Sequence, residues 1–265
     1  MSGTLLKLAS RLVGRLRAPL ADPRQCPACN AARLRARRAG QSRKILECRA
    51  CGHLFAAEPP DERALEDLHS PDHFAMIEKE LGCRDNPDAW EGWKAWKEEL
   101  LDFFGIDRSD AQARRVLDVG CGHGKLLELL ADRGWECVGV DLSAAVDDLR
   151  LPPGIRIIRA AFDQHDFGED RFDLAAMVHV LEHFVDPAAA LGKTRRLLKV
   201  DGRLLVEVPL FIDLDDLHHQ HFFSPDSLRH VLEKTGFAPL KERTYRDGLN
   251  PERENLVVLC GRKAS

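Results

Sequence analysis

Residues 116–127 read VLDVGCGHGKLL, an apolar run that leads into three closely spaced glycines and then into a leucine-rich segment. The apolar run favours a buried strand, and the leucines after the glycines favour a helix. Gly120, Gly122 and Gly124 therefore belong to a strand-to-helix turn. Glycines there let a ligand approach the backbone, and the first helical amides face that ligand. Alone, such a triplet is only a weak sign of a nucleotide-type site.

The segments on both sides of this turn alternate between strand-like and helix-like patterns. Strand-like runs occupy residues 114–120, 136–143, 155–160, 172–180 and 203–210, and two further runs at 241–245 and 255–263 predict a terminal hairpin. Helix-like runs occupy residues 125–134, 144–150, 187–200 and 224–237. This rhythm predicts an α/β fold, a Rossmann-like, doubly wound and mostly parallel seven-stranded sheet. Such sheets bind ligands at the carboxyl ends of their strands.

A carboxylate at the end of the second strand strengthens the case for a nucleoside site. Asp141 closes the run VGVDLS, roughly 20 residues after the glycines, where an acid can accept hydrogen bonds from both ribose hydroxyls. Only the spacing G-x-G-x-G, in place of G-x-G-x-x-G, separates the pattern from that of a dinucleotide fold.

Five motifs in order resemble class I S-adenosylmethionine (SAM)-dependent methyltransferases, above all the "VLEH…DP" branch that includes quinone- and natural-product-modifying enzymes. The resemblance covers residues 114–261, and its motifs are VLDVGCGHG, VGVDLS, FDLAAMVHVLEHFVDP, LLKVDGRLLVEVP and HFFS. It implies SAM as co-substrate, with the three glycines at the methionine end, Asp118 nearby, Asp141 on the ribose and Leu142 on the adenine. His179 is expected to face the same edge, and we count it with the cofactor-binding residues.

The adenine contacts depart from the family pattern. Many members carry an acid before the fourth strand, and that position is Ala161 in this chain. Either Asp163 replaces the acid, or backbone groups and Phe162 hold the adenine.

Two C-x2-C pairs near the N-terminus predict a zinc ribbon. Cys26 and Cys29 are separated from Cys48 and Cys51 by 18 residues, and the four thiolates would close a tetrahedral shell. A closed shell predicts a structural Zn²⁺. His53 is an alternative ligand to Cys51.

Charge and cysteine usage suggest the organisation of the chain. Residues 1–53 hold 12 Lys/Arg and 2 Asp/Glu, although the whole chain has a net charge of -4. We therefore divide the chain into an amphipathic basic helix (1–20), the ribbon (21–57), a helical bridge or lid (58–112) and the SAM-binding domain (113–265). No run approaches ~18 apolar residues, which excludes a transmembrane helix, and paired cysteines without a secretory signal predict the reducing cytoplasm.

The basic N-terminal region has several interpretations. The helix at residues 4–17 suits docking, with an anionic membrane surface, nucleic acid or an organellar transit peptide as alternatives. Residues 33–44 hold six basic side chains, which form either a solvated hairpin tip or a surface for RNA or nucleotide phosphates. In the bridge, the aromatic stripe of residues 90–104 predicts a helix that packs on the core or walls the acceptor pocket.

Three histidines in DDLHHQHFFS (215–224) follow the fifth strand and should lie at the ligand-binding edge. Imidazole titrates near neutral pH and can deprotonate or orient an acceptor, so His219 and His221, on alternate loop positions, are the favoured catalytic residues, together with His183. Structural hydrogen bonding is a second interpretation. A second metal site with Asp213, Asp215 or Glu182, holding zinc or manganese, is the third.

Three classes of function fit these features. The leading one is methyl transfer to a small-molecule or biosynthetic-intermediate acceptor. The N-terminal ribbon also resembles that of enzymes that C-methylate nucleotide-linked deoxysugars, but the C-terminal domain of those enzymes has no counterpart in this sequence. The alternative is a zinc-ribbon methyltransferase of ribosomal RNA bases, and the third is a non-catalytic binding module. The acceptor atom and the oligomeric state stay open.

Overall fold

The computed structural model describes residues 24–37, 43–60, 67–70, 72–73, 75–76, 87–106, 114–210, 213–246 and 254–263. The predicted helix at 4–17 lies outside these residues. Among the described residues, no helix combines the length and the apolar character needed to cross a membrane.

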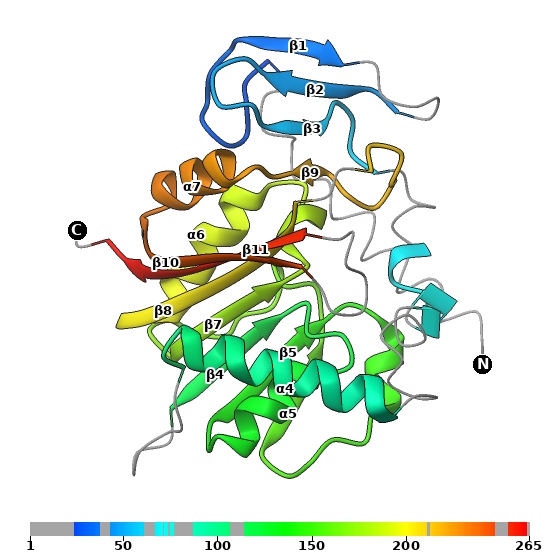
Figure 1. The fold of residues 1–265 in the computed structure, drawn as a ribbon, viewed down its shortest axis with the longest axis vertical. Helices are drawn as coiled ribbons and strands as arrows, with labels where there is room; N and C mark the ends of the chain where they lie inside the picture. Colours follow the sequence, from blue (N-terminus) through cyan, green and yellow to red (C-terminus); the bar gives the residue numbers. More distant parts are fainter. Residues whose placement is uncertain are drawn as a thin grey trace.

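A seven-stranded, mostly parallel sheet forms the centre of the molecule (Figure 1). Its strands in spatial order are β10 (Phe237–Arg246), β11 (Glu254–Arg262), β8 (Leu198–Pro209), β7 (Phe172–Val178), β4 (Arg115–Val119), β5 (Glu136–Asp141) and β6 (Ile155–Arg159). Only β11 runs antiparallel to both of its neighbours. The predicted fold class and the terminal hairpin are thus confirmed.

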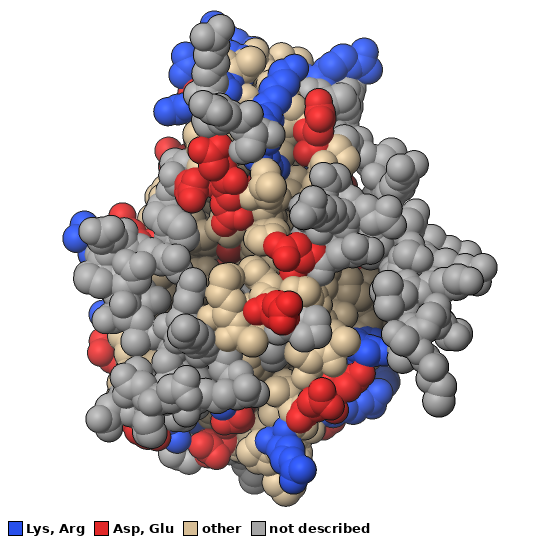
Figure 2. All heavy atoms as spheres, turned by 90° about the vertical axis from the view of Figure 1, so that its right-hand side faces the viewer, with Lys and Arg blue, Asp and Glu red and all other residues tan. Residues whose placement is uncertain are grey.

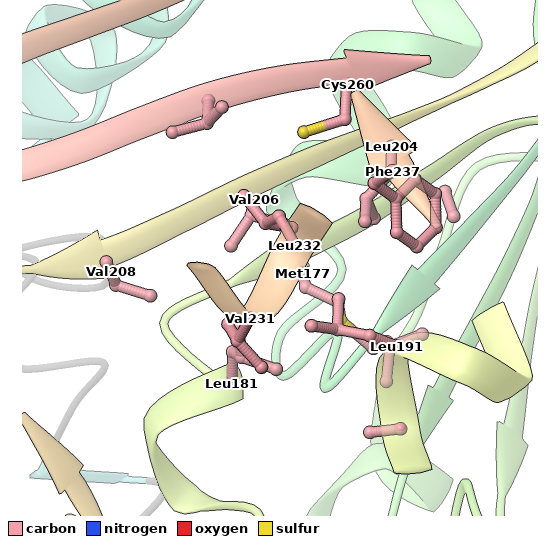
Figure 3. Packing of buried hydrophobic residues seen from close by; sticks show 14 of the residues in the cluster. Met177, Leu181, Leu191, Leu204, Val206, Val208, Val231, Leu232, Phe237 and Cys260 are labelled. Atoms are coloured by element: carbon pink, nitrogen blue, oxygen red, sulfur yellow. The ribbon is translucent and has the colours of Figure 1, made fainter. Parts of the chain in front are cut away.

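Helices cover both faces of this sheet. They are α4 (Pro87–Phe103), α5 (Lys125–Asp132), α6 (Pro187–Leu197) and α7 (Pro225–Lys234), with the short 3-10 helices η1 (Ala144–Asp148) and η2 (Leu181–His183). One core layer joins the sheet to α6 and α7, as Figure 3 shows for Leu191, Val231 and Leu232 around Met177 and Val206. The other layer joins the opposite side chains to α4 and α5. This division follows from the period of two along each buried strand.

The predicted boundary between the fourth helix-like run and the strand after it is wrong. The helix expected over residues 187–200 ends at Leu197, because Leu198 has extended backbone and pairs with Phe172 at the start of β8. Burying Leu198 in the core layer outweighs the helical pattern of the sequence. Strand β8 therefore begins before residue 203.

The N-terminal ribbon is a separate small sheet whose last strand comes from the large domain. It contains β1 (Leu34–Arg37), β2 (Ile45–Cys48), β3 (Leu54–Ala56) and β9 (His221–Phe222), in that order. In Figure 1, β9 lies directly below β3 and beside α7. Residues 221 and 222 are therefore a strand paired with β3, and not part of the loop expected after the fifth strand.

Hydrogen bonds from basic side chains fasten the ribbon to the domain. Arg43 Nη1 donates to the carbonyls of Asp216 and His219, both at 2.7 Å. Lys234 Nζ donates to the carbonyl of Pro27 at 2.9 Å and to Asn30 Oδ1 at 2.7 Å. Since β9 completes the ribbon sheet, that sheet contains residues from both sides of the bridge expected at 58–112.

Candidate functional site

The glycine turn lies where β4 ends and α5 begins. Gly120, Gly122 and Gly124 all have positive φ, between 48° and 73°, a region in which L side chains are strained. A Cβ at Gly120 would come within 2.5 Å of Val180, whereas one at Gly122 would meet nothing within 4 Å. The turn is thus packed on the side of the 179–183 segment and open at Gly122.

Asp141 connects the glycine turn to the end of β5. Its Oδ2 accepts a hydrogen bond from the amide of Gly122 at 2.9 Å, and its Oδ1 accepts one from the amide of Ser143 at 2.8 Å. Carboxylate oxygens retain further lone pairs after such bonds, so Asp141 can still accept ribose hydroxyls. The open backbone at Gly122 beside this carboxylate fits the nucleoside and amino-acid parts of SAM.

A segment that sequence reasoning overlooked lies against the same edge. Ser143 Oγ donates to the carbonyl of His69 at 3.3 Å. Burial lowers the pKa of His69, although the nearby charge of Asp141 opposes this shift. No motif marked residue 69, because its position depends on a contact between segments far apart in the chain.

Asp118 is a buried acid on β4, next to the glycine turn. Its side chain is 3% exposed, and burial, together with the charge of Asp141, raises its pKa to about 8. The resemblance places this carboxyl near the methionine end of SAM. In the protein without ligand, it is largely protonated at pH 7.

The pKa of Asp118 gives a pH-dependent expectation. Because the pKa is higher in the folded than in the unfolded state, Asp118 stabilises the fold at low pH and loses this contribution as pH rises toward 8. Between pH 6.5 and 7.5, Asp118→Asn should gain about 1.4 kcal/mol in free energy of unfolding relative to the unmodified protein. Urea unfolding of both proteins at pH 6.5 and at pH 7.5 measures this difference in the free energy of unfolding. The exposed control Asp148→Asn should show no gain, and parallel pH profiles for Asp118→Asn would disprove the effect.

The expected adenine residues lie at the end of β6. Ala161 and Phe162 are each 6% exposed, and the ring of Phe162 packs against Phe167 and beneath Lys193 Nζ. Asp163, the alternative to the missing acid, is exposed, and Leu142 is half-buried. These positions do not distinguish Asp163 from Phe162 as the residue that holds the adenine, so both alternatives stay predictions.

His179 lies at the end of β7, with a φ of 51°. Its Nε2 is 3.0 Å from Glu207 Oε1, and its Nδ1 is 3.7 Å from Glu182 Oε1. Although desolvation opposes its charge, these two carboxylates raise the pKa of His179 to about 9. His179 is therefore held as an imidazolium at the edge where it was expected.

Glu207, which the sequence analysis did not single out, anchors a buried polar cluster under His179. Lys97 Nζ on α4 lies 2.5 Å from Glu207 Oε2, and Tyr245 donates its hydroxyl to the other oxygen. Burial opposes the charge of Glu207, but Lys97 and His179 hold the pKa of its carboxyl well below its ordinary value. The sequence signal that could have identified Glu207 is its position as an acid inside the apolar run LLVEVP.

The structure separates the histidines of the 215–224 stretch. The ring of His219 lies 4.9 Å from that of His183, with Asp216 Oδ2 3.6 Å from His219 Nε2. His218 pairs with Asp67 at 3.3 Å. His221 faces the ribbon instead, where its Nδ1 is 3.0 Å from His53 Nε2. His219 and His221 thus have different neighbours, because residue 221 belongs to β9.

The four ribbon cysteines converge on one point. Their sulfurs all lie within 4.8 Å of one another, and the pairs Cys26–Cys51 and Cys29–Cys48 are each 3.6 Å apart. Tetrahedral Zn–S bonds of about 2.3 Å require sulfurs roughly 3.8 Å apart, so the thiols fit a zinc ion. His53 is directed away from them, with its Nδ1 3.2 Å from Ser227 Oγ.

Comparison with known proteins connects this geometry to a family. The protein-family model described as "Methyltransferase domain" matches residues 89–242 of this chain. The ubiquinone biosynthesis O-methyltransferase of Alkalilimnicola ehrlichii is 38% identical over 112 residues, 40% of this chain and 45% of the relative. That of Xylella fastidiosa is 39% identical over 113 residues, again 40% of this chain and 46% of the relative. The chain thus matches less than half the length of these curated relatives.

Solved structures show the same fold. A 1,6-didemethyltoxoflavin-N1-methyltransferase from Burkholderia thailandensis, with S-adenosylhomocysteine (SAH) bound, has a TM-score of 0.57 and 20% identity, covering 86% of this chain and 99% of that one. A putative methyltransferase in complex with the Trm112 activator of Haloferax volcanii has a TM-score of 0.58 and 16% identity, covering 73% and 96%. The two solved structures thus share the fold of this chain, and the match over residues 89–242, which is more than half of the sequence, identifies the chain as a member of the methyltransferase domain family.

Proposed function

We propose that the chain is a SAM-dependent methyltransferase acting on a small-molecule or biosynthetic-intermediate acceptor. The hydrogen bond between Asp141 and the amide of Gly122 carries this proposal, because it places an acid and an open glycine backbone together at the carboxyl edge of the sheet. When bound, SAM supplies the activated methyl group. The names of the ubiquinone-pathway relatives support a small biosynthetic acceptor.

Different residues of the chain would contact different parts of SAM. Gly120, Gly122 and Gly124 would line the methionine end, with Asp118 and His179 beside it. Asp141 would accept the ribose hydroxyls, and Leu142, Ala161 and Phe162 would bound the adenine. The protein contributes alignment of donor and acceptor, which can lower the barrier of a displacement without covalent catalysis.

On the acceptor side we retain His219 and His183 as candidates for orienting or deprotonating the acceptor. Both lie near Glu182, three residues after His179 on the ligand-binding edge. The burial of His221, which is 4% exposed, and its contact with His53 support a structural role for that third candidate.

Calorimetric titration with SAH tests the proposal. The full chain should bind SAH, and Asp141→Ala should weaken binding about 100-fold, since it removes a charged acceptor of ribose hydroxyls and releases the Gly122 amide. Asp148→Asn, an exposed acid on η1 nearby, should bind like the unmodified chain. Absence of SAH binding would instead favour a non-catalytic module, and equal affinity in Asp141→Ala would refute the assigned site.

We also propose that the four ribbon thiols hold a structural Zn²⁺, supported by the convergence of their sulfurs. The described cysteines, which form no disulfide, are consistent with a reducing compartment, and we place the protein in the cytoplasm.

The RNA-methyltransferase alternative receives less support. Lys and Arg do gather on the ribbon at the top of Figure 2. However, Arg35 and Arg37 pair with Glu47, and Arg43 donates to the 216–220 backbone. These internal contacts support a structural use of the basic hairpin.

A further inference from the structure

We propose that Glu182, His183 and His219 form a second metal site, which binds a zinc-type divalent cation beside the glycine turn. One donor atom from each of the three side chains lies within 4.8 Å of the others. Zinc bonds to nitrogen and oxygen of about 2.0–2.2 Å place donors roughly 3.4 Å apart. The donor atoms therefore need to approach one another by at most about 1.4 Å around an ion.

The carboxylate of Glu182 is the observation that points to a missing cation. Its residue is 1% exposed, and neither oxygen has a hydrogen-bond partner. The His179 imidazolium balances part of the charge of Glu182, but at 3.7 Å it is beyond hydrogen-bonding distance. Buried carboxylates without hydrogen bonds are costly, and coordination to a cation would satisfy both oxygens of Glu182.

A neighbouring carbonyl orients His183, and a carboxylate lies 3.6 Å from His219. His183 Nδ1 is 3.0 Å from the carbonyl of His218, which can only accept, so this nitrogen carries the proton and Nε2 can act as a ligand. Asp216 lies beside His219 and also accepts from the amide of His218 at 2.8 Å. Carbonyl and carboxylate partners of this kind commonly orient metal-binding imidazoles.

The donor set favours a particular class of ion. Two imidazoles and one carboxylate suit zinc and its neighbours in the first transition row, whereas Mg²⁺ prefers an all-oxygen shell. Three protein ligands leave at least one coordination position, as in catalytic zinc sites. The acceptor would therefore be a molecule that offers an oxygen donor, such as a hydroxyl or a carboxylate.

The location connects this ion to methyl transfer. Glu182 and His183 belong to η2, which directly follows the Val180 side chain packed on Gly120. His219 comes from the segment before β9, and the amide of Gln220 donates to the carbonyl of Glu182 at 2.8 Å. An ion here would tie these two segments together beside the cofactor edge. With one ring nitrogen each on the ion, His183 and His219 would orient the acceptor through the ion and would not deprotonate it. Its use by the acceptor rests on the proposed function, whereas the metal site itself does not.

Zinc titration of the full chain, with its ribbon already loaded with zinc, tests the site. We expect one further equivalent of Zn²⁺ to bind, with no detectable binding at this site in Glu182→Gln or His219→Ala. Asp216→Asn should weaken it about 10–100-fold, the usual effect of removing an outer partner. His230→Ala, which removes an exposed histidine on α7, should bind Zn²⁺ like the unmodified chain. Titration with Co²⁺ should give visible absorption without the thiolate bands that exchange into the ribbon would produce.

SAH binding, measured on the same samples, separates the two proposals and reports folding. A chain that binds SAH but takes up no second zinc would overturn the metal site and leave the methyltransferase proposal standing. Equal zinc affinity in Glu182→Gln would also overturn it. Zinc uptake that depends on Glu182 and His219 would support the site even if SAH failed to bind, in which case only the proposed function would fall.

Discussion

Replacing Cys48 with serine is expected to remove the tightly bound ribbon zinc and to unfold the ribbon. Four-ligand zinc sites in small domains contribute about 10–16 kcal/mol of apparent binding free energy, and folding depends on it. The ribbon has only short strands and a small apolar cluster of Ile45, Leu54 and Phe222 around which to fold without the ion. We therefore expect loss of one zinc equivalent after dialysis against a mild chelator.

The consequence should extend into the large domain, because β9 pairs with β3 and the buried Cys26 and Cys48 belong to the core layer that includes α7. Hydrogen exchange followed by mass spectrometry should show that the amides of residues 54–56 and 221–222 lose protection together. Cys260→Ala, in β11, should keep the zinc and this protection. Protection of residues 221–222 that survives in Cys48→Ser would show that β9 does not depend on the ribbon.

Replacing Lys97 with alanine is expected to lower the free energy of unfolding by about 3 kcal/mol. The Lys97–Glu207 pair is buried, with side chains 6% and 1% exposed, and removing one partner of such a pair leaves a charge without compensation. His179 and Tyr245 still contact Glu207, which places the effect near the low end of the usual range. Urea unfolding at pH 7 measures the change.

Two further variants separate charge from packing at this position. Lys97 Nζ lies 4.7 Å from the centre of the Trp96 ring, so Lys97→Met keeps much of the packing while removing the charge. We expect it to cost nearly as much as alanine, and a cost below about 1 kcal/mol would show that the charge is not what matters. Lys94→Ala, on the same helix, breaks only an exposed pair with Asp132 and should change stability by about 0.5 kcal/mol or less.

The buried Lys97–Glu207 pair reaches the ligand-binding edge of the sheet through His179. The ion pair between Lys97 and Glu207 links α4 to β8. Glu207 also pairs with His179, which in turn lies 3.7 Å from Glu182. The covering helix and the acceptor-side residues are thus joined through buried charges. For the Lys97 variants, SAH affinity should therefore be measured together with the free energy of unfolding.

Local patterns were sufficient for most elements of the large domain, although not for the start of β8 or for β9. The apolar period of two in FDLAAMV, the leucine spacing of α5 and the Ser224 cap of α7 are each decided by neighbours in sequence, and their elements form as predicted. The glycine turn and Asp141 were found in the same way, since a strand end and the next helix fix their positions. The C-x2-C spacing likewise predicted four converging sulfurs.

The tertiary structure decided those features that depend on contacts between segments far apart in the sequence. Residues 221–222 carry no signal that they will pair with Leu54 and Phe55, far earlier in the chain. This register nevertheless directs His221 to His53 and leaves His219 near Glu182 and His183. Lys97 and Glu207 likewise meet only when α4 packs on β8. Sequence by itself determined the periodic elements and the cofactor edge, because local spacing specifies them. Which histidines lie near Glu182 was decided by contacts between distant segments, which no single stretch encodes.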